Sequence, residues 1–144
     1  MATTGGRFVV AAPVAEVHAF FADPHRRPQW QSSLRRIEDV SPADPGVGQS
    51  WVDVTAAGVR PRMETTEHDA PTRWAERGTW RGFEAWLGMD LAPTDGGTEV
   101  RWEMRLGATG PGRPLAAVLR RAAPYAIASD LRRAARILEH PPRL

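Results

Sequence analysis

The sequence of 144 residues contains no cysteine and no lysine. Without cysteine there can be no disulfide, no thiolate metal ligand and no cysteine nucleophile. No stretch approaches the ~18 consecutive apolar residues that a membrane-spanning helix needs. The N-terminal stretch MATTGGRFVV also lacks the charged start and long apolar segment of a signal peptide. These absences predict a soluble, cytoplasmic protein with no stable membrane insertion.

Because lysine is absent, all 19 basic residues are arginine, and 17 acidic residues oppose them, which leaves a net charge of +2. The isoelectric point is nevertheless about 10.3, since almost nothing titrates between histidine and arginine. The high isoelectric point is therefore no sign of a basic stripe. No nucleic-acid partner is predicted.

Hydrophobic periodicity divides the chain into strands and helices, and 42% hydrophobic residues in this length suit a single domain over residues 1–144. Strands are predicted over 7–12, 34–40, 50–55, 59–68, 73–80, 83–92 and 98–106. Helices are predicted over 14–22, from 24 to a limit at Pro28, and over 114–139, with a kink or a broken turn at Pro124. This order predicts an α+β fold in which a helix lies against one face of an antiparallel sheet.

Several stretches in this order resemble the START-like/Bet v 1-like superfamily (SRPBCC), especially its bacterial polyketide cyclase/dehydrase branch. The matching stretches are Ala12–Val17, Phe20–Pro24 with Trp30, Glu67–Trp74, Gly96–Trp102 and the long C-terminal helix. The resemblance spans nearly the whole chain. It specifies the fold well and the reaction poorly.

The resemblance implies a helix-grip fold, in which a curved seven-stranded antiparallel sheet wraps the long C-terminal helix and two short helices follow the first strand. It also implies a cavity between sheet and helix that holds an apolar small molecule. Members range from sterol and lipid carriers to aromatase/cyclases that act on carrier-bound polyketides. Because they share no short catalytic motif, the function does not follow from the fold alone.

Alternation along two late strands predicts which side chains face this cavity. In the last strand Val100, Trp102, Met104 and Leu106 share the apolar face, opposite a charged set. In the strand before it the apolar face carries Phe83, Ala85, Leu87, Met89 and Leu91, and Trp86 falls on the other side.

The strand 73–80 contains the candidate catalytic group. Trp74, Glu76, Gly78 and Trp80 share one face, so inward-pointing tryptophans would bring Glu76 with them. A carboxyl group between two indoles would have a raised pKa and would suit a general acid or base. The alternative is that Glu76 lies near the cavity mouth or pairs with an arginine across the sheet.

The strand 59–68 allows two orientations. Hydrophobicity places Val59 and Met63 inward, whereas the register of the family favours Glu64 and His68 inward together with Thr66. In the second case His68 and Glu76 would lie on adjacent strands and form a hydrogen-bonded acid/base pair. Charged side chains on a solvated face are the simpler alternative.

Three further features leave alternatives open. In strand 50–55 either Trp51 and Asp53 or Val52 and Val54 face the cavity. The hydroxyl of Tyr125 reaches a ligand, or the ring packs at the helix surface. The six tryptophans offer flat stacking surfaces to a planar ligand, or they fill the core.

Other catalytic classes lack their motifs. The four histidines are scattered without metal-ligand spacing, so no metal site is predicted. There is no G-x-S-x-G, P-loop or G-x-G-x-x-G motif, and no cofactor is predicted. The arginines of the last helix form a solvated face that can also dock an acidic carrier protein.

Two functions remain at this point. The first is binding of an apolar, aromatic or polyketide-like molecule with cyclisation or dehydration of that molecule, and the second is a non-catalytic lipid or quinone carrier. The expected partners are the small molecule and an acyl carrier protein, and the expected state is a monomer or homodimer. The candidate catalytic residues are Glu76 and His68. The candidate ligand-binding residues are Trp51, Glu64, Trp74, Trp80, Phe83, Leu87, Met89, Trp102, Met104 and Tyr125.

Overall fold

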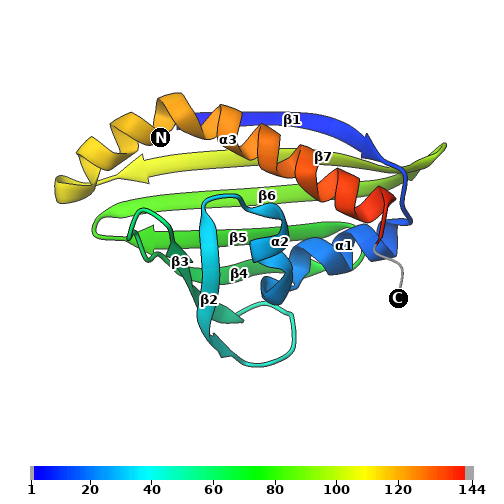
Figure 1. Cartoon of the computed structure of the whole chain (residues 1–144), viewed down its shortest axis with the longest axis horizontal. Helices are drawn as coiled ribbons and strands as arrows, with labels where there is room; N and C mark the ends of the chain where they lie inside the picture. Colours follow the sequence, from blue (N-terminus) through cyan, green and yellow to red (C-terminus); the bar gives the residue numbers. More distant parts are fainter. Residues whose placement is uncertain (1, 142–144) are drawn as a thin grey trace.

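The computed structural model describes residues 2–141 as one curved antiparallel sheet with helices on its concave side (Figure 1). The seven strands lie in the order β1-β7-β6-β5-β4-β3-β2. The strands are β1 (Ala2–Val10), β2 (Leu34–Ser41), β3 (Ser50–Thr55), β4 (Arg62–Asp69), β5 (Arg73–Trp80), β6 (Phe83–Thr94) and β7 (Gly97–Ala108). The helices are α1 (Val14–Ala22), η1 (Pro24–Arg26), α2 (Arg27–Trp30), η2 (Gly110–Gly112) and α3 (Arg113–Glu139).

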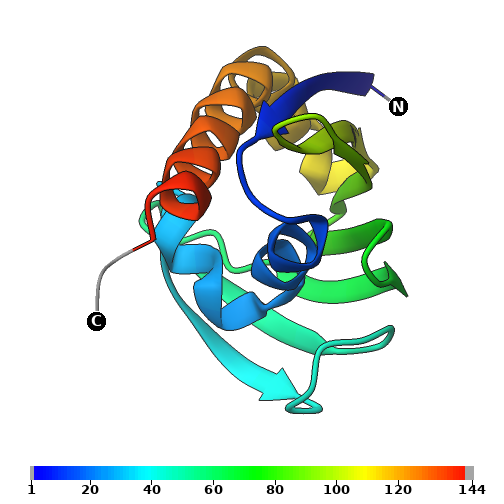
Figure 2. The ribbon, with the colours of Figure 1, turned by 90° about the vertical axis from the view of Figure 1, so that its right-hand side faces the viewer.

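The long helix α3 crosses the sheet, and the sheet bends around it and around α1 and α2 (Figure 2). Helix α3 contacts β1, β6 and β7 of the sheet and also α1 and α2. The predicted helix-grip fold is confirmed. None of the helices within residues 2–141 combines the length and apolar character that crossing a membrane requires.

The first helix follows its sequence pattern closely. Helix α1 begins directly after Pro13, and it buries Val17, Phe20 and Phe21 as the helical spacing predicts. The ring of Phe21 stacks on Trp74 of β5 at 6.3 Å and meets Trp30 of α2 edge-on at 5.3 Å. These aromatic contacts fill the core at the end of the sheet that α1 covers.

The prediction that Pro28 limits the second short helix was wrong. Pro28 instead lies in the first turn of α2, where the missing backbone N–H has no partner to lose. The preceding turn η1 is capped by Asp23, whose side chain accepts from the backbone N–H of His25 at 2.9 Å. As a result the chain turns into α2 at Arg27, and this residue and Trp30 become buried.

Three other elements differ from prediction. Strand β1 spans Ala2–Val10 and not residues 7–12, because the pairing with β7 begins at Ala2 opposite Leu106 and ends at Val10 opposite Thr98. Strand β4 begins at Arg62 and not at Val59, although backbone hydrogen bonds from Asp53 to Pro61 and from Thr55 to Val59 still hold this segment beside β3. Helix α3 runs without interruption through Pro124, where a kink or broken turn was expected.

Candidate functional site

A cavity of about 280 Å³ lies between the sheet and the middle of α3. Its lining divides into an apolar part and a polar part. The apolar part includes Met63, Phe83, Leu87, Met104, Leu106, Leu119 and Ile127. The polar part consists of Arg27, Gln31, Ser33, Asp53, Glu76 and Asp130. An amphiphilic small molecule would match such a lining.

Three side chains from three elements form a buried ion cluster at the polar end. Arg27 of α2 donates from Nε to Asp53 Oδ1 at 3.2 Å and from Nη2 to Asp53 Oδ2 at 2.9 Å. The same guanidinium donates from Nη1 to Glu76 Oε2. Only 1% of Arg27 and 5% of each carboxylate residue is exposed. The cluster therefore lies almost entirely out of water.

Indole rings hold the cluster in place. Trp51 Nε1 donates to Asp53 Oδ1 at 2.9 Å, so the alternative with Trp51 and Asp53 inward is the one found. The guanidinium of Arg27 lies over the ring of Trp51 at 5.1 Å and over Trp30 at 5.9 Å. Aromatic faces attract a guanidinium and limit its movement.

The cluster contains one cation and two carboxyl groups, and this imbalance falls on Glu76. Burial raises the pKa of Glu76, and the neighbouring Asp53 raises it further, against the opposing influence of Arg27. Burial acts to lower the pKa of Arg27, but the two carboxylates raise it well above its ordinary value, so Arg27 stays charged. Glu76 is thus a carboxyl group that takes up a proton more readily than one in water.

Sequence analysis identified Glu76 but missed Arg27. One of its alternatives paired Glu76 with an arginine across the sheet, and the partner is indeed an arginine, but it comes from α2. No periodicity marks a buried arginine in a helix of four residues. The available signal was charge balance, because Asp53 and Glu76 facing inward on two strands require a buried cation.

A β-bulge between Thr65 and Glu67 settles the orientation of β4. Met63 lies opposite Gly78, and Thr65 lies opposite Glu76. Beyond the bulge His68 lies opposite Trp74. The extra residue shifts the alternation by one, so Met63 and His68 lie on the same side of the strand although five positions separate them.

The predicted hydrogen-bonded pair of His68 and Glu76 is absent from the described residues, since the bulge places Thr65 and not His68 beside Glu76. His68 lies instead against His18, with ring centroids 4.9 Å apart, in a separate depression beside α1. Burial lowers the pKa of His68, and the neighbouring His18 lowers it further. His68 therefore does not line the cavity.

Six of the ten expected ligand-binding residues fall into two groups. Phe83, Leu87 and Met104 line the cavity. Trp51 contacts the ion cluster, and Trp74 and Met89 belong to the hydrophobic core. All three residues are buried, and none of them lines the cavity. Alternation gave the observed face for Phe83, Leu87, Met89 and Met104 and left that of Trp51 and Trp74 open, and the core residues of α1 and α2 occupy part of this face.

The other four expected residues lie away from the cavity. Glu64 is on the outer face, where its carboxylate is 3.8 Å from Arg77. Trp102 lines a separate groove between β1 and α3. Trp80 lies under the guanidinium of Arg81 at 4.8 Å. Tyr125 is 79% exposed, because its position on α3 faces away from the sheet.

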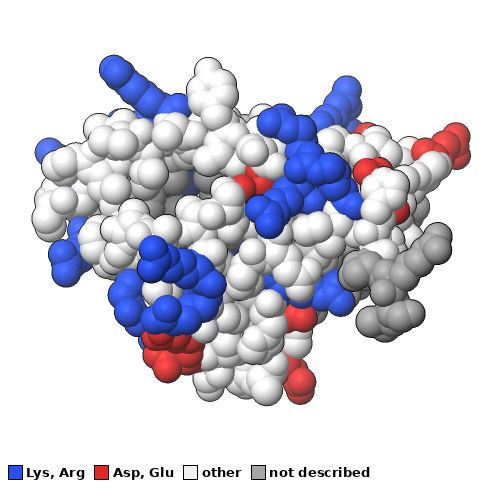
Figure 3. All heavy atoms as spheres, viewed as in Figure 1, with Lys and Arg blue, Asp and Glu red and all other residues white. Residues whose placement is uncertain are grey.

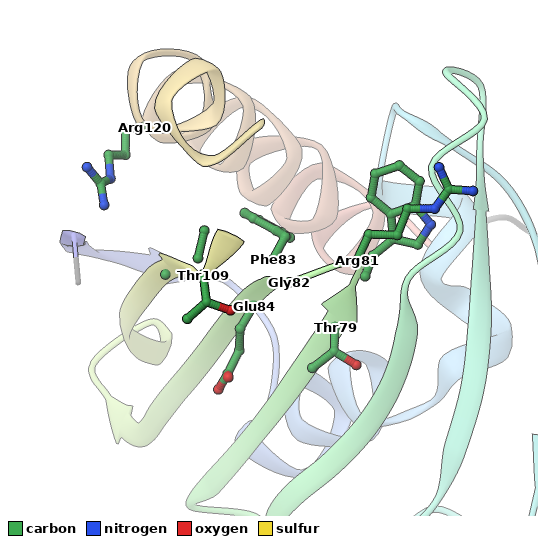
Figure 4. Close-up of a pocket in the computed structure, with 10 residues that line it drawn as sticks. Thr79, Arg81, Gly82, Phe83, Glu84, Thr109 and Arg120 are labelled. Atoms are coloured by element: carbon green, nitrogen blue, oxygen red, sulfur yellow. The ribbon is translucent and has the colours of Figure 1, made fainter. Parts of the chain in front are cut away.

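A surface depression of about 540 Å³ adjoins the apolar end of the cavity (Figure 4). It lies at the β5–β6 turn, with Glu84 and Thr109 on its walls and Arg120 reaching in from α3. Phe83 lines both the depression and the cavity. This ring therefore lies between the cavity and the surface.

No group of three or more histidine, aspartate or glutamate side chains within residues 2–141 has a metal-binding arrangement. The polar side chains that line the cavity are those of the ion cluster, Asp130, Gln31 and Ser33.

The fold has solved counterparts of low sequence identity. A protein from Chromobacterium violaceum matches with a TM-score of 0.72 at 17% identity over 98% of each chain. One from Mesorhizobium loti matches with a TM-score of 0.72 at 15% identity, over 99% of this chain and 100% of that one. The di-domain ARO/CYC protein StfQ from the steffimycin biosynthetic pathway matches with a TM-score of 0.75 at 14% identity, over 95% of this chain and 50% of that one.

These similarities show a shared fold. No curated protein is similar enough in sequence to count as a relative. The family model described as polyketide cyclase / dehydrase and lipid transport matches residues 1–139. With nearly the whole chain matched, the protein belongs to the polyketide cyclase/dehydrase and lipid transport family.

Proposed function

We propose that this protein binds an apolar, aromatic or polyketide-like molecule in the cavity and promotes its cyclisation or dehydration with Glu76 as the acid/base group. One observation carries the proposal: a buried carboxyl group with a raised pKa lines a largely apolar cavity. A group of this kind, held beside a bound molecule, can exchange protons with it.

The proposed reaction needs only proton transfers and a folded substrate. The Glu76 carboxylate removes a proton from a carbon next to a carbonyl, and that carbon attacks a second carbonyl carbon of the same molecule. The protonated Glu76 returns its proton to the oxygen of the attacked carbonyl, which becomes a hydroxyl group. The Glu76 carboxylate then removes a second proton from the neighbouring carbon and passes it to this hydroxyl group, which leaves as water while a carbon–carbon double bond forms. The cavity contributes by holding the two carbons together.

Arg27 and Asp53 serve as positioning residues in this proposal. The guanidinium is fixed by two hydrogen bonds to Asp53 and by the rings of Trp51 and Trp30. Its third nitrogen, Nη1, donates to Glu76 Oε2. Arg27 thereby orients the carboxyl group, and it stabilises the carboxylate whenever the proton has left.

An acyl carrier protein is the proposed source of the substrate. Arginine side chains gather over the C-terminal half of α3, where Arg132, Arg133 and Arg136 are exposed (Figure 3). Such a cluster would attract an acidic carrier. The depression at Phe83 is the proposed route from such a carrier into the cavity.

The Glu76→Gln variant tests the catalytic role. The substrate is a linear poly-β-ketone thioester of the kind that an acyl carrier delivers, and cyclised product is followed by chromatography. We expect Glu76→Gln to lower turnover by about 10²–10⁴-fold, while ligand binding and the circular dichroism spectrum change little. The matched control is Glu64→Gln, which makes the same change on the outer face and should leave turnover unaltered. Equal turnover in Glu76→Gln and wild type would remove Glu76 from this role.

The second candidate is a non-catalytic lipid or quinone carrier. It is favoured by the direct ion pair between Glu76 and Arg27, which holds the carboxyl group as a structural partner would. A carrier keeps its cargo, so native mass spectrometry of the purified protein would find a bound lipid or quinone. In that case neither Glu76→Gln nor Glu64→Gln would alter any turnover, because none would be detected in wild type.

A further inference from the structure

Asp130 is a buried carboxylate in the middle of α3 that the proposed reaction does not use. It is 8% exposed and lines the cavity. Aspartate is rarely buried without a charged partner. Yet no arginine or histidine within residues 2–141 forms an ion pair with Asp130, which distinguishes it from Asp53 and Glu76.

Only one of the two carboxylate oxygens of Asp130 has a partner. Both the backbone N–H and the hydroxyl group of Ser32 donate to Oδ1, at 3.2 and 2.9 Å. No described residue donates to Oδ2. Oδ2 is not among the fully enclosed polar atoms that lack a partner, so it is accessible from the cavity, and a bound molecule that displaces solvent from it must supply a donor in its place.

The charges around the cavity reinforce this requirement. The lining holds three carboxyl groups, on Asp53, Glu76 and Asp130, and one cation, on Arg27. The guanidinium of Arg27 is already engaged by two of these carboxyl groups. A bound anion would therefore meet uncompensated negative charge and no free cation, whereas a donor would meet a favourable potential.

We propose that the cavity selects apolar molecules whose polar end donates a hydrogen bond, a hydroxyl or an ammonium group, to Asp130 Oδ2, and that it rejects molecules ending in a carboxylate or sulfonate. This inference rests on the proposed function only in requiring that the cavity binds an apolar molecule. It names the class of that molecule and assigns Asp130 as the residue that determines it.

Two fluorescent probes with the same ring system test the selection. N-phenyl-1-naphthylamine is neutral and carries an N–H donor, and 8-anilinonaphthalene-1-sulfonate adds a sulfonate to it. A phenylalanine at position 123 fills the cavity from α3. The part of each titration that Ala123→Phe abolishes is therefore taken as binding to the cavity. We expect the neutral probe to bind there at least about tenfold more tightly than the sulfonate.

Competition against the neutral probe extends the test to the polar end group. Decanol and decylamine share their chain with decanoate and differ from it in offering a donor and lacking a negative charge. Both should displace the probe at concentrations at least about tenfold lower than decanoate does. The alcohol and the amine separate a neutral donor from a charged one.

Asp130→Asn isolates the contribution of Oδ2. The asparagine side-chain oxygen can still accept from Ser32, while the other position becomes an NH₂ donor. We expect the preference for decanol over decanoate to fall by about tenfold or more in this variant. Ser32→Ala is the matched control, since it removes the hydroxyl contact to Oδ1, keeps the backbone N–H contact, leaves Oδ2 unchanged and should leave the preference intact.

The outcomes separate this inference from the proposed function. Displacement by decanoate as readily as by decanol, or an unchanged preference in Asp130→Asn, would overturn the inference while leaving cavity binding in place. If the neutral probe bound wild type no better than Ala123→Phe, both the inference and the proposed function would be contradicted.

Discussion

At the scale of single residues, the central feature is a buried arginine shared by two carboxyl groups. Arg27 compensates charge that Asp53 and Glu76 bring into a low-dielectric site, and all three make hydrogen bonds within the cluster. A complete buried cluster of this kind adds little to stability, but the loss of one member is costly. Its residues therefore give clear predictions for mutation.

Replacing Arg27 should destabilise the fold strongly. Arg27→Met leaves two buried carboxyl groups without a cation, and we expect the free energy of unfolding to fall by about 3–5 kcal/mol in urea titrations. The adjacent Arg26 is the matched control, because its side chain is 51% exposed and lies 3.9 Å from Asp23. Arg26→Met should cost less than about 1 kcal/mol. Similar losses for the two variants would show that the cluster is not the buried, charge-dependent unit described.

Glu76 should also make stability depend on pH in a characteristic direction. Because its pKa in the folded state is raised above the ordinary value of 4.5, the folded protein holds a proton that the unfolded chain releases. The stabilisation from this proton is fully present below 4.5 and is lost as pH rises through the raised pKa. Wild type should therefore lose stability relative to Glu76→Gln as pH increases over this window, in urea titrations at a series of pH values. The opposite trend would mean that the influence of Arg27 outweighs that of burial and holds the pKa of Glu76 below its ordinary value.

At the scale of elements, sequence patterns located most of the fold. The bounds predicted for α1, β3 and β5 agree with the structure, because Pro13, the turn at 56–58 and the turn at 81–82 mark their ends. Two features of the site escaped this reasoning. The bulge in β4 changes the alternation without a glycine or proline to signal it, and the burial of Arg27 depends on partners from β3 and β5 that are distant in sequence.

The β5–β6 turn offers a test of how the wall of the cavity is built. Gly82 has φ +80°, and a Cβ there would lie next to the backbone oxygen of Thr109, which it cannot displace. Gly96, in the β6–β7 turn, has φ +86° and open space around it. Gly96→Ala should therefore cost about 1–2 kcal/mol from its backbone conformation alone.

Gly82→Ala should cost roughly 1–3 kcal/mol more than Gly96→Ala, because the close contact with Thr109 adds to the backbone penalty. Thermal unfolding followed by circular dichroism measures both losses. Equal destabilisation would indicate that the β5–β6 turn and the segment before α3 are not packed against each other as the structure describes.

At the scale of the whole molecule, the sheet and α3 surround a cavity that the core leaves open. The aromatic residues of α1 and α2 fill one end of the concave face, while α3 contributes mainly alanine, with Leu119 and Ile127, above the other end. The resemblance predicted this arrangement and the family match supports it. The polarity of the cavity depends on Arg27 and Asp130, two side chains that no local pattern in the sequence distinguishes from solvated ones.

Binding within this cavity is the central claim, and native mass spectrometry of the protein titrated with N-phenyl-1-naphthylamine tests it most directly. Wild type should form a one-to-one complex. Ala117→Phe, an exposed change on the same helix, should bind as wild type does, whereas Ala123→Phe, which fills the cavity, should bind at least about tenfold more weakly. Equal binding by Ala123→Phe and wild type would place the ligand elsewhere and contradict the account.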